Sequence, residues 1–464
     1  MGVADKYKAE LRANGEKLSF AELGFPRPPE NGEGLARLTN AVSQIQSSGS
    51  SPSDLALMHF IRPGQAQVCW RSSDGPTVYE RNHATNWISW DELHAHLSGL
   101  ADPLAEIRTA AERPMRWFLS DPANHWANDD PTNAPKYSFV MIRNAAQWLS
   151  DDAIGALHAN KRDRVLKDIH AEAQLAGFNR EDPTLIAQMI RVDISGLGLI
   201  VTWEVLQDAN WTEPELATMQ RDWERIDLLK AFETGLLGER ALGEAIFTEI
   251  RKDGAQRMIK NLFPPGRGTS PFKNIERFLS ALAWRMNAQE DELLLFQHYQ
   301  GLLESIRDLQ KQKPWPEVSK KEMAVYKELD RFAGKSIGYY FSFNIIPNGE
   351  RAFQSAVQNE TMRQLTITAI ALKRYELGHH RLPSDLAELV PEFLSAVPID
   401  PMSGQPLRYH LNADGSFVLY SVGEDGHDDG GNPNPPKSSD RPGLWSGRDA
   451  VWPVAAPGPA RTGN

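Results

Sequence analysis

Residues 89–107, SWDELHAHLSGLADPLAEI, carry the pattern that decides the fold class of this chain. Ser89 and Glu92 form a capping box, in which the serine hydroxyl and the glutamate carboxylate satisfy two backbone N–H groups at a helix start. Five apolar side chains then recur at helical spacing on one face: Leu93, Leu97, Leu100, Leu104 and Ile107. The stretch therefore predicts an amphipathic helix that packs against other helices.

Similar helix starts occur along the chain, so we expect a run of antiparallel helices from about residue 85 to 375. Thr212–Glu215 repeats the capping box, and Asp182–Pro183 places proline in the first turn of a helix. Ser319–Glu322 marks one more start. No fixed repeat period is visible, which argues against a regular solenoid. The fold class that follows is mainly α.

Composition excludes several classes of protein. The 464 residues suggest about three domains. Their 50 Lys and Arg against 61 Asp and Glu give a net charge of −11, which argues against nucleic-acid binding through a basic face and against a polybasic membrane-surface protein. The single cysteine, Cys69, excludes an internal disulfide and a cysteine-rich metal site. We expect its thiol to be buried and unreactive.

Neither the N-terminal residues nor the most apolar internal stretch indicates a targeting or membrane-spanning segment. Residues 1–20 have no apolar core, so they are neither a signal peptide nor an anchor. Leu185–Leu206 is the most apolar stretch, but it contains Arg191 and Asp193. Each of these would cost about 3 kcal/mol at the centre of a bilayer. We therefore expect a buried helix rather than a membrane span.

Changes in composition predict four segments. A Ser/Gly/Pro linker ends the first, and a strand pair is expected at 55–80, on either side of the turn dipeptide Pro63–Gly64. Phe417–Val422 is a β-type run in an otherwise Gly- and Pro-rich end. The expected segments are an N-terminal part (1–54), a multi-helix body (55–360), a small α+β module (361–453) and a tail (454–464).

Residues 421–431, SVGEDGHDDGG, gather carboxylates in a loop whose glycines permit positive φ. Crowded carboxylates repel one another unless a cation joins them, and Ca²⁺ takes 6–8 oxygen ligands, backbone carbonyls included. An EF-hand is excluded, because its third and twelfth positions, counted from Asp425, are His427 and Pro436. Composition alone leaves two alternatives open, a cation site and a solvated acidic turn.

Residues 361–453 resemble the C-terminal part of the major pseudopilin of type II secretion systems. A helix that runs into Tyr375–Pro383 carries the resemblance, together with five later phrases: Leu386–Pro391, Val397–Pro401, Gly404–Tyr409, Leu419–Gly426 and Asp449–Trp452. The chain departs from that family in two ways. It lacks the N-terminal hydrophobic stalk, and Pro433–Gly447 lengthens the loop before Asp449.

The resemblance implies a small pseudopilin-like α+β domain whose loop binds Ca²⁺. Asp425 and Asp449 would be the side-chain ligands, and main-chain carbonyls near Val422 would assist. Asp428 and Asp429 would be additional or more distant groups. An extracellular-type site of this kind binds Ca²⁺ at about 10⁻⁴–10⁻³ M. The ion would stabilise the folded protein by mass action.

The whole chain also resembles a group of uncharacterised envelope proteins from planctomycete and verrucomicrobial bacteria. The matching phrases are Asp5–Leu11, Gly15–Leu18, Gly238–Ala241 and the C-terminal phrases above. The resemblance implies a protein at the periplasmic or extracytoplasmic face of a membrane, tethered only by an anchor that this chain lacks. Its expected partner is a protein of the envelope or the secretion apparatus. We do not expect it to bind nucleic acid.

We therefore expect a non-enzymatic structural or interaction protein of the cell envelope. One alternative is an envelope hydrolase with catalytic residues dispersed through 85–360, which a deep pocket lined by histidines and carboxylates of shifted pKa would favour. A second is a helical module that binds a peptide in an apolar groove. No His-Glu-x-x-His, P-loop or Gly-x-Ser-x-Gly motif occurs.

Other polar pairs have structural interpretations. Asp129–Asp130 and Asp151–Asp152 are interpreted as N-terminal helix caps. Glu239–Arg240 is interpreted as a solvated or interhelical pair. His94 and His96 lie two residues apart and so point to different faces of their helix, where a metal pair would need i,i+4 spacing.

Overall fold

Helices make up most of the described chain, as the sequence predicts. The computed structural model describes residues 2–24, 33–79, 85–113, 139–178, 180, 182–253, 271–333, 342, 349–437 and 441–457. The helices of these residues are α1 (Val3–Ala13), α2 (Phe20–Leu23), α3 (Glu33–Ser47), α4 (Trp90–Gly99), α5 (Ala101–Ala111), α7 (Phe139–His158), α8 (Arg162–Ala176), α9 (Leu185–Leu206), α10 (Glu213–Glu224), α11 (Leu228–Asp253), α13 (Pro271–Gln310), α14 (Trp315–Ala333) and α16 (Glu350–His379).

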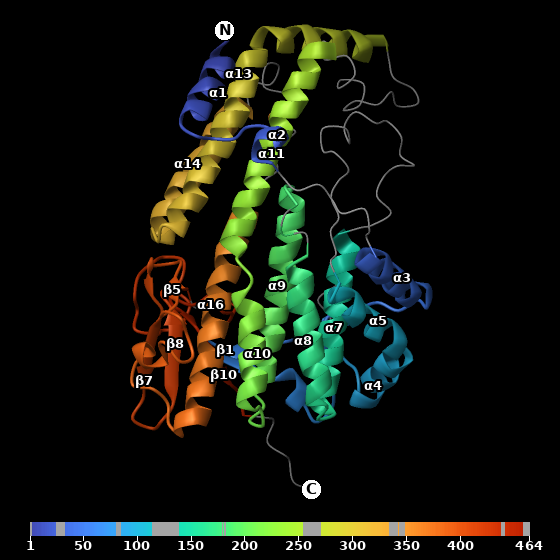
Figure 1. Cartoon of the computed structure of the whole chain (residues 1–464), viewed down its shortest axis with the longest axis vertical. Helices are drawn as coiled ribbons and strands as arrows, with labels where there is room; N and C mark the ends of the chain where they lie inside the picture. The colour runs from blue at the N-terminus through green and yellow to red at the C-terminus, as the bar shows by residue number, and fades with distance from the viewer. Residues whose placement is uncertain are drawn as a thin grey trace.

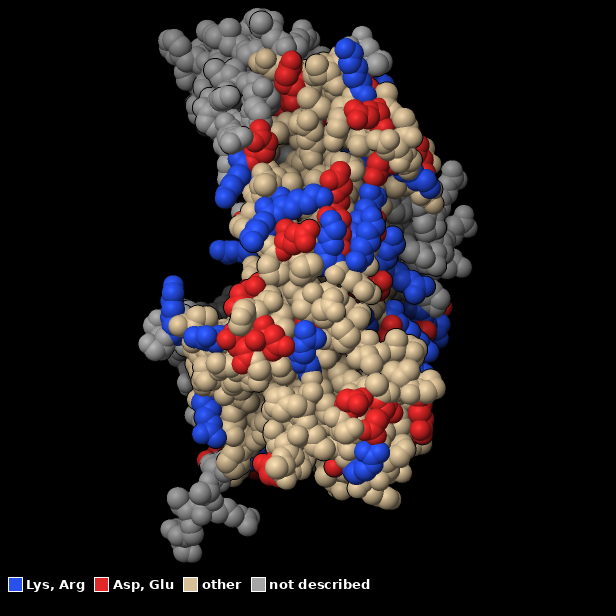
Figure 2. Space-filling model, turned by 90° about the vertical axis from the view of Figure 1, so that its left-hand side faces the viewer, with Lys and Arg blue, Asp and Glu red and all other residues tan. Residues whose placement is uncertain are grey.

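Figure 1 shows an elongated molecule in which long helices run roughly along one axis. At one end, α1, α13 and α14 lie together beside the upper half of α11. At the other end, α3, α4, α5, α7 and α8 form one side, and α16 with the strands that follow it up to residue 421 forms the opposite side. On the face that carries α14, basic and acidic side chains are interspersed (Figure 2), and Lys321, for example, pairs with Glu304 and Asp308 at 3.2 Å.

The central helix α9 joins these groups, because it packs against α7, α8, α11 and α16. It is the helix that is long and apolar enough to span a membrane by length and composition, among the described residues. Most of it is buried inside the protein, including Trp203. The Arg191 guanidinium donates to Ala176 O and Gln188 Oε1 at 2.7 Å each. The predicted buried helix is thus observed.

Helix starts that a local capping box defines lie where the sequence predicts them, and two other helix starts do not. Ser89 and Thr212 cap α4 and α10 as predicted. The helix expected at Asp182–Pro183 begins later, at Leu185, after the cap Thr184. The start expected at Ser319 is wrong, because α14 already begins at Trp315, with Pro316 in the first turn, where a missing N–H costs nothing.

Asp151 and Asp152 are not helix caps. They lie inside α7 and are buried, so the prediction is wrong. Both carboxylates bond to groups on other segments. Ser53 N donates to Asp151 Oδ2 at 2.7 Å, and arginines from α5 and α8 pair with Asp152. Asp129–Asp130 lie outside the described residues.

The strands of the described residues form four small sheets. They are β1 (His59–Arg62), β2 (Gln65–Gln67), β3 (Thr77–Tyr79), β4 (Thr85–Trp87), β5 (Ile399–Asp400), β6 (Gln405–Pro406), β7 (Arg408–Leu411), β8 (Phe417–Ser421), β9 (Ala450–Val451) and β10 (Val454–Ala455). β1 and β2 pair antiparallel around Pro63–Gly64, but Cys69–Arg71 turns into a 3₁₀ helix instead of continuing the second strand. Cys69 is buried, as expected.

The C-terminal module consists of β5–β6 and the antiparallel sheet β7–β8–β9, laid against α16. Helix α16 runs without a break across the predicted boundary at 360/361. Val454–Ala455, in the predicted tail, forms β10 and pairs parallel with β2. The register of β8 with β9 sets Ser421 opposite Ala450, which brings the two ends of the acidic loop together.

Candidate functional site

The five predicted calcium-binding residues lie in one loop region between β8 and β9, in different environments. Val422 follows β8 and is buried, and Asp449 precedes β9 and is 1% exposed. A Cβ on Gly423 would lie 2.5 Å from the Arg448 carbonyl oxygen, so the segments of Val422 and Asp449 are in contact despite the long insertion. Asp425 and Asp428 are exposed, and Asp429 is half-buried.

Asp449 organises the loop around itself. Its Oδ2 accepts hydrogen bonds from Gly431 N and Asn432 N at 2.8 Å each, and its Oδ1 accepts one from Asp429 N at 3.3 Å. Burial raises the pKa of Asp449, and these N–H donors oppose that rise. The carboxylate therefore acts here as the anion that a turn of backbone N–H groups surrounds.

Asp428 and Asp429 each face basic groups. Arg408 Nε and the Tyr420 hydroxyl donate to Asp428 at 2.9 Å each. Partial burial works in the opposite direction, but these hydrogen bonds hold the pKa of Asp428 below its usual range. Asp429 lies 3.4 Å from both Arg448 Nη1 and His427 Nδ1. Their charges are thus neutralised by neighbouring side chains.

Among Asp425, Asp428, Asp429 and Asp449, Asp425 is the carboxylate with the fewest protein partners. Its Oδ1 accepts one hydrogen bond, from His427 N at 2.9 Å. Its neighbour Glu424 turns the other way and accepts from Gln354 and Gln358 of α16 at 2.6 Å each. In the described ranges, no group of three or more His, Cys, Asp or Glu side chains is placed to hold a metal ion. Among the described residues, Asp425 therefore keeps the most capacity to bind a cation, whereas both carboxylate oxygens of Asp449 already accept backbone N–H groups.

Sequence reasoning missed Asp400, the most buried carboxylate of the module. Ser421 Oγ donates to it at 2.7 Å, Met402 N at 3.0 Å and Val422 N at 3.1 Å. Burial raises the pKa of Asp400, and these donors oppose the rise. Asp400 therefore ties β5 to the end of β8, directly under the acidic loop. The signal was present in the phrase Val397–Pro401, where an aspartate sits between apolar residues and proline.

A hollow of about 590 Å³ lies in the helical body, between α5, α8 and α10. Five basic side chains, two carboxylates and one asparagine line it, and no histidine is among them. The most strongly shifted histidine lies elsewhere: burial lowers the pKa of His298, on α13, to about 4. Burial also raises the pKa of Glu322, on α14, to about 8. This hollow does not combine the groups that the hydrolase alternative requires.

Glu239 and Arg240, interpreted as a solvated or interhelical pair, are not solvated: each bonds to another helix, and Arg240 also bonds to Gln300 of α13. Glu239 Oε1 accepts from Leu185 N, at the start of α9, at 2.9 Å. Arg240 is fully buried and donates from Nη2 to Glu16 Oε2 and Lys17 O at 2.9 Å each. The structure thereby joins two phrases that the sequence separates by more than 200 residues, Gly15–Leu18 and Gly238–Ala241.

Comparisons with known proteins give this chain no family: no protein-family model, no curated protein and no solved structure matches it.

Proposed function

We propose that this protein is a non-enzymatic structural or interaction protein of the bacterial cell envelope. In this proposal the C-terminal module, which resembles a type II secretion pseudopilin, is a fixed part of the helical body and presents a surface to another protein of the envelope or secretion apparatus. Ca²⁺ stabilises the loop between Val422 and Asp449.

The observation that carries the proposal is the double role of α16. The helix packs against α9, α10 and α11 of the body and also against β5 and β8 of the module. Lys373, near its C-terminal end, donates from Nζ to Leu206 O and Asp208 O at 2.7 Å each, where α9 ends. A module on such a helix moves with the body, which suits a rigid scaffold.

The end of the described chain is fastened in the same way. Trp203 of α9 donates from Nε1 to Pro453 O at 3.0 Å. Val454 N then donates to Gly64 O at 3.0 Å, and Ala456 N donates to Ala66 O at 2.8 Å. Segments from the start, middle and end of the chain thus share one sheet and one core helix, a further feature that supports a scaffold.

The Ca²⁺ part of the proposal is tested by thermal unfolding of the full chain in millimolar Ca²⁺ and in excess chelator. We expect a higher Tm with Ca²⁺, by the mass-action stabilisation of the folded state. Asp425→Asn should abolish the shift, because it removes the exposed charged ligand. Asp74→Asn, which changes an exposed aspartate bonded to Ser73, is the matched control and should keep it. No shift in the unmodified chain, or an equal shift in Asp425→Asn, overturns this part.

The placement in the envelope is tested by fractionating cells that produce the protein from its complete gene. We expect it in the envelope fraction and cleaved by protease added outside the cytoplasmic membrane. A photo-crosslinking residue at Leu411, 41% exposed on β7, should then trap an extracytoplasmic protein, and one at Val140, 60% exposed on α7, should not. Recovery with cytosolic markers, or equal crosslinks at both positions, contradicts the proposal.

A further inference from the structure

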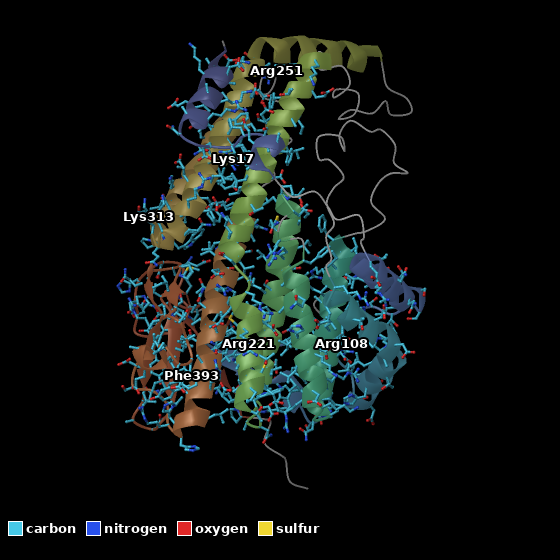
Figure 3. The ribbon with its side chains drawn as sticks, viewed as in Figure 1. Lys17, Arg108, Arg221, Arg251, Lys313 and Phe393 are labelled. Atoms are coloured by element: carbon cyan, nitrogen blue, oxygen red, sulfur yellow. The ribbon has the colours of Figure 1, made fainter. Side chains whose placement is uncertain are left out.

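The hollow between α5, α8 and α10 gathers an excess of positive charge. Its basic side chains are Arg108 from α5 and Lys161, Arg162, Arg164 and Lys167 from the start of α8, against the two acids Asp163 and Glu215. The whole chain has a net charge of −11, so a local basic surface stands out against a field that repels anions. Arg108 lies beside α7 and α8 in Figure 3.

The start of α8 is mainly basic, with Asp163 as the acidic residue of its first turn. Helix N-termini favour acidic residues, because the unpaired N–H groups there carry partial positive charge. Here the N-cap is Lys161, whose side chain caps no N–H group, and arginines occupy positions 162 and 164. A cation at such a place is repelled by the helix end. A bound anion would turn this repulsion into attraction by both the side chains and the helix end.

Two of the arginines are held in place from behind. Arg108 Nε donates to Asp168 Oδ1 at 2.6 Å, and Arg108 Nη2 pairs with Asp152. Arg164 Nε donates to Asp152 Oδ2 at 2.6 Å, and Arg164 Nη2 pairs with the same carboxylate. Both acids are buried beneath the hollow. These bonds occupy Nε and Nη2 of each guanidinium, so Nη1 of each stays available to a ligand.

The other three basic groups have few partners. Lys161 and Lys167 are exposed, and neither forms an ion pair within the described part of the chain. Arg162 has a long ion pair with Asp208, at 3.9 Å, and donates to Asn160 Oδ1 at 3.5 Å. Two positioned arginines, two unpaired lysines and one weakly paired arginine thus line the same hollow.

We propose that this hollow binds a phosphorylated small molecule through its phosphate-type oxyanion. Arginine matches the geometry of phosphate oxygens by paired hydrogen bonds, and lysine adds a mobile point charge. The volume of about 590 Å³ falls within the range of small-molecule sites, about 300–1,000 Å³, and exceeds what a single phosphate fills. This binding activity is additional to the envelope role and does not depend on it.

Calorimetric titration of the full chain with inorganic pyrophosphate, at ionic strength held constant with chloride, tests the site. We expect saturable binding that weakens at least tenfold in K161Q/K167Q, which removes two cations without an ion pair among the described residues. K311Q/K320Q removes two exposed lysines beside and within α14 and is the matched control, which should bind like the unmodified chain. Absent binding to the unmodified chain, or equal binding by both double variants, overturns the proposal.

A second arm identifies the source of the phosphate. Flotation with vesicles of phosphatidylglycerol or phosphatidylcholine asks whether the hollow accepts a lipid headgroup. Vesicle binding that requires phosphatidylglycerol, is displaced by pyrophosphate and is lost in K161Q/K167Q supports a headgroup ligand. Pyrophosphate binding without vesicle binding supports a soluble phosphorylated ligand. Vesicle binding that survives in K161Q/K167Q while pyrophosphate fails to bind contradicts the site.

Discussion

His170 shows how one side chain can join three helices in a way that depends on pH. It lies on α8 and bonds through Nδ1 to Asp222 of α10 at 2.8 Å and through Nε2 to Glu112, at the end of α5, at 3.0 Å. The hydrogen bond to Asp222 raises the pKa of His170, burial lowers it, and Arg225 beside Asp222 also lowers it. The net effect is a rise, so the folded state favours the charged imidazole.

The consequence for stability has a definite sign. A histidine with a raised folded pKa adds stability that is fully present below its unfolded pKa, about 6.5, and is lost as the pH rises through the folded pKa. His170→Asn should therefore lower the Tm most below about pH 6.5, and the difference from the unmodified chain should shrink at higher pH. Thermal melts from acid to mildly alkaline buffer measure this.

His380→Asn is the matched control for that series. His380 is exposed at the C-cap of α16 with φ of 55°, a left-handed conformation that asparagine also adopts. This variant should change the Tm little, and by the same amount at every pH. A pH-independent loss in His170→Asn would show that the imidazole acts only by packing.

A single glycine fixes the contact of two long helices. Gly238 of α11 lies so close to Pro183 that an added Cβ would overlap the Pro183 carbonyl oxygen. Because the obstacle is backbone ahead of the buried helix α9, it cannot move aside cheaply. Gly238→Ala should destabilise the protein by about 1–3 kcal/mol, the usual cost of overpacking. The midpoint of urea unfolding measures the loss.

Gly99→Ala provides the comparison for Gly238→Ala, since both place alanine in a helix. Nothing lies within 4 Å of a Cβ on Gly99, the last residue of α4. Alanine forms helix better than glycine by up to about 1 kcal/mol, so this change should be neutral or stabilising. Equal destabilisation by both variants would contradict the close-approach explanation.

At the scale of elements, the N-terminal segment is held by buried charge rather than by apolar packing alone. Arg240 of α11 bonds to Glu16 and to the backbone of Lys17, and Arg307 of α13 also pairs with Glu16. Burial and these arginines act in opposite directions on Glu16, and the arginines prevail, lowering the pKa of Glu16 to about 2. One carboxylate thus fastens the turn after α1 to two long helices.

Arg240→Ala should therefore loosen the attachment of α1 and α2 and destabilise the protein, by less than the about 3–5 kcal/mol of a fully broken buried pair, because Arg307 still pairs with Glu16. Arg12→Ala, which breaks an exposed pair with Glu22 in the same segment, should cost about 1 kcal/mol or less. Urea unfolding gives both values, and hydrogen exchange of α1 amides shows whether the segment detaches. Retained protection of α1 in Arg240→Ala would contradict the prediction.

The elements also show which parts of the fold a sequence can give. The starts of α4 and α10 were predictable, because a capping box lies within four consecutive residues. Asp151 and Asp152 are acidic residues of the kind that cap helix starts, but their partners lie on α5, α8 and near residue 53, so neighbouring residues could not reveal their interior position. The contact of Glu16 with Arg240 was hidden for the same reason.

For the acidic loop too, the sequence predicts which residues lie together but not which partners they bind. The sequence indicated that Val422, Asp425, Asp428, Asp429 and Asp449 belong to one region, and β8–β9 pairing places them there. Which carboxylate meets an arginine and which meets backbone N–H groups depends on Arg408 and on the turn at 429–432, and neither follows from spacing. Asp400 escaped notice because it lies alone in the sequence, although it joins the same region in space.

For the whole molecule, the sharing of α16 predicts that module and body unfold together. The module contacts the body through this helix, through β10 on β2 and through Trp315 N, which donates to Met402 O at 3.2 Å. An appended domain would instead unfold in a separate transition. Hydrogen exchange in increasing urea, followed in peptides from β8 and from α9, should give the same opening free energy for both.

The variant Asp400→Ala tests whether the module and the body unfold as one unit. The change leaves the buried donors Ser421 Oγ, Met402 N and Val422 N without their acceptor, which costs about 1–3 kcal/mol. If the molecule is one cooperative unit, peptides of α9 lose as much opening free energy as those of β8, although the hydrogen bonds of the Asp400 side chain among the described residues are to β8 and to residues near β5. Asp414→Ala, in the exposed turn between β7 and β8, should lower both by less. Loss confined to β8 would show an independently unfolding module and remove the main support for a rigid scaffold.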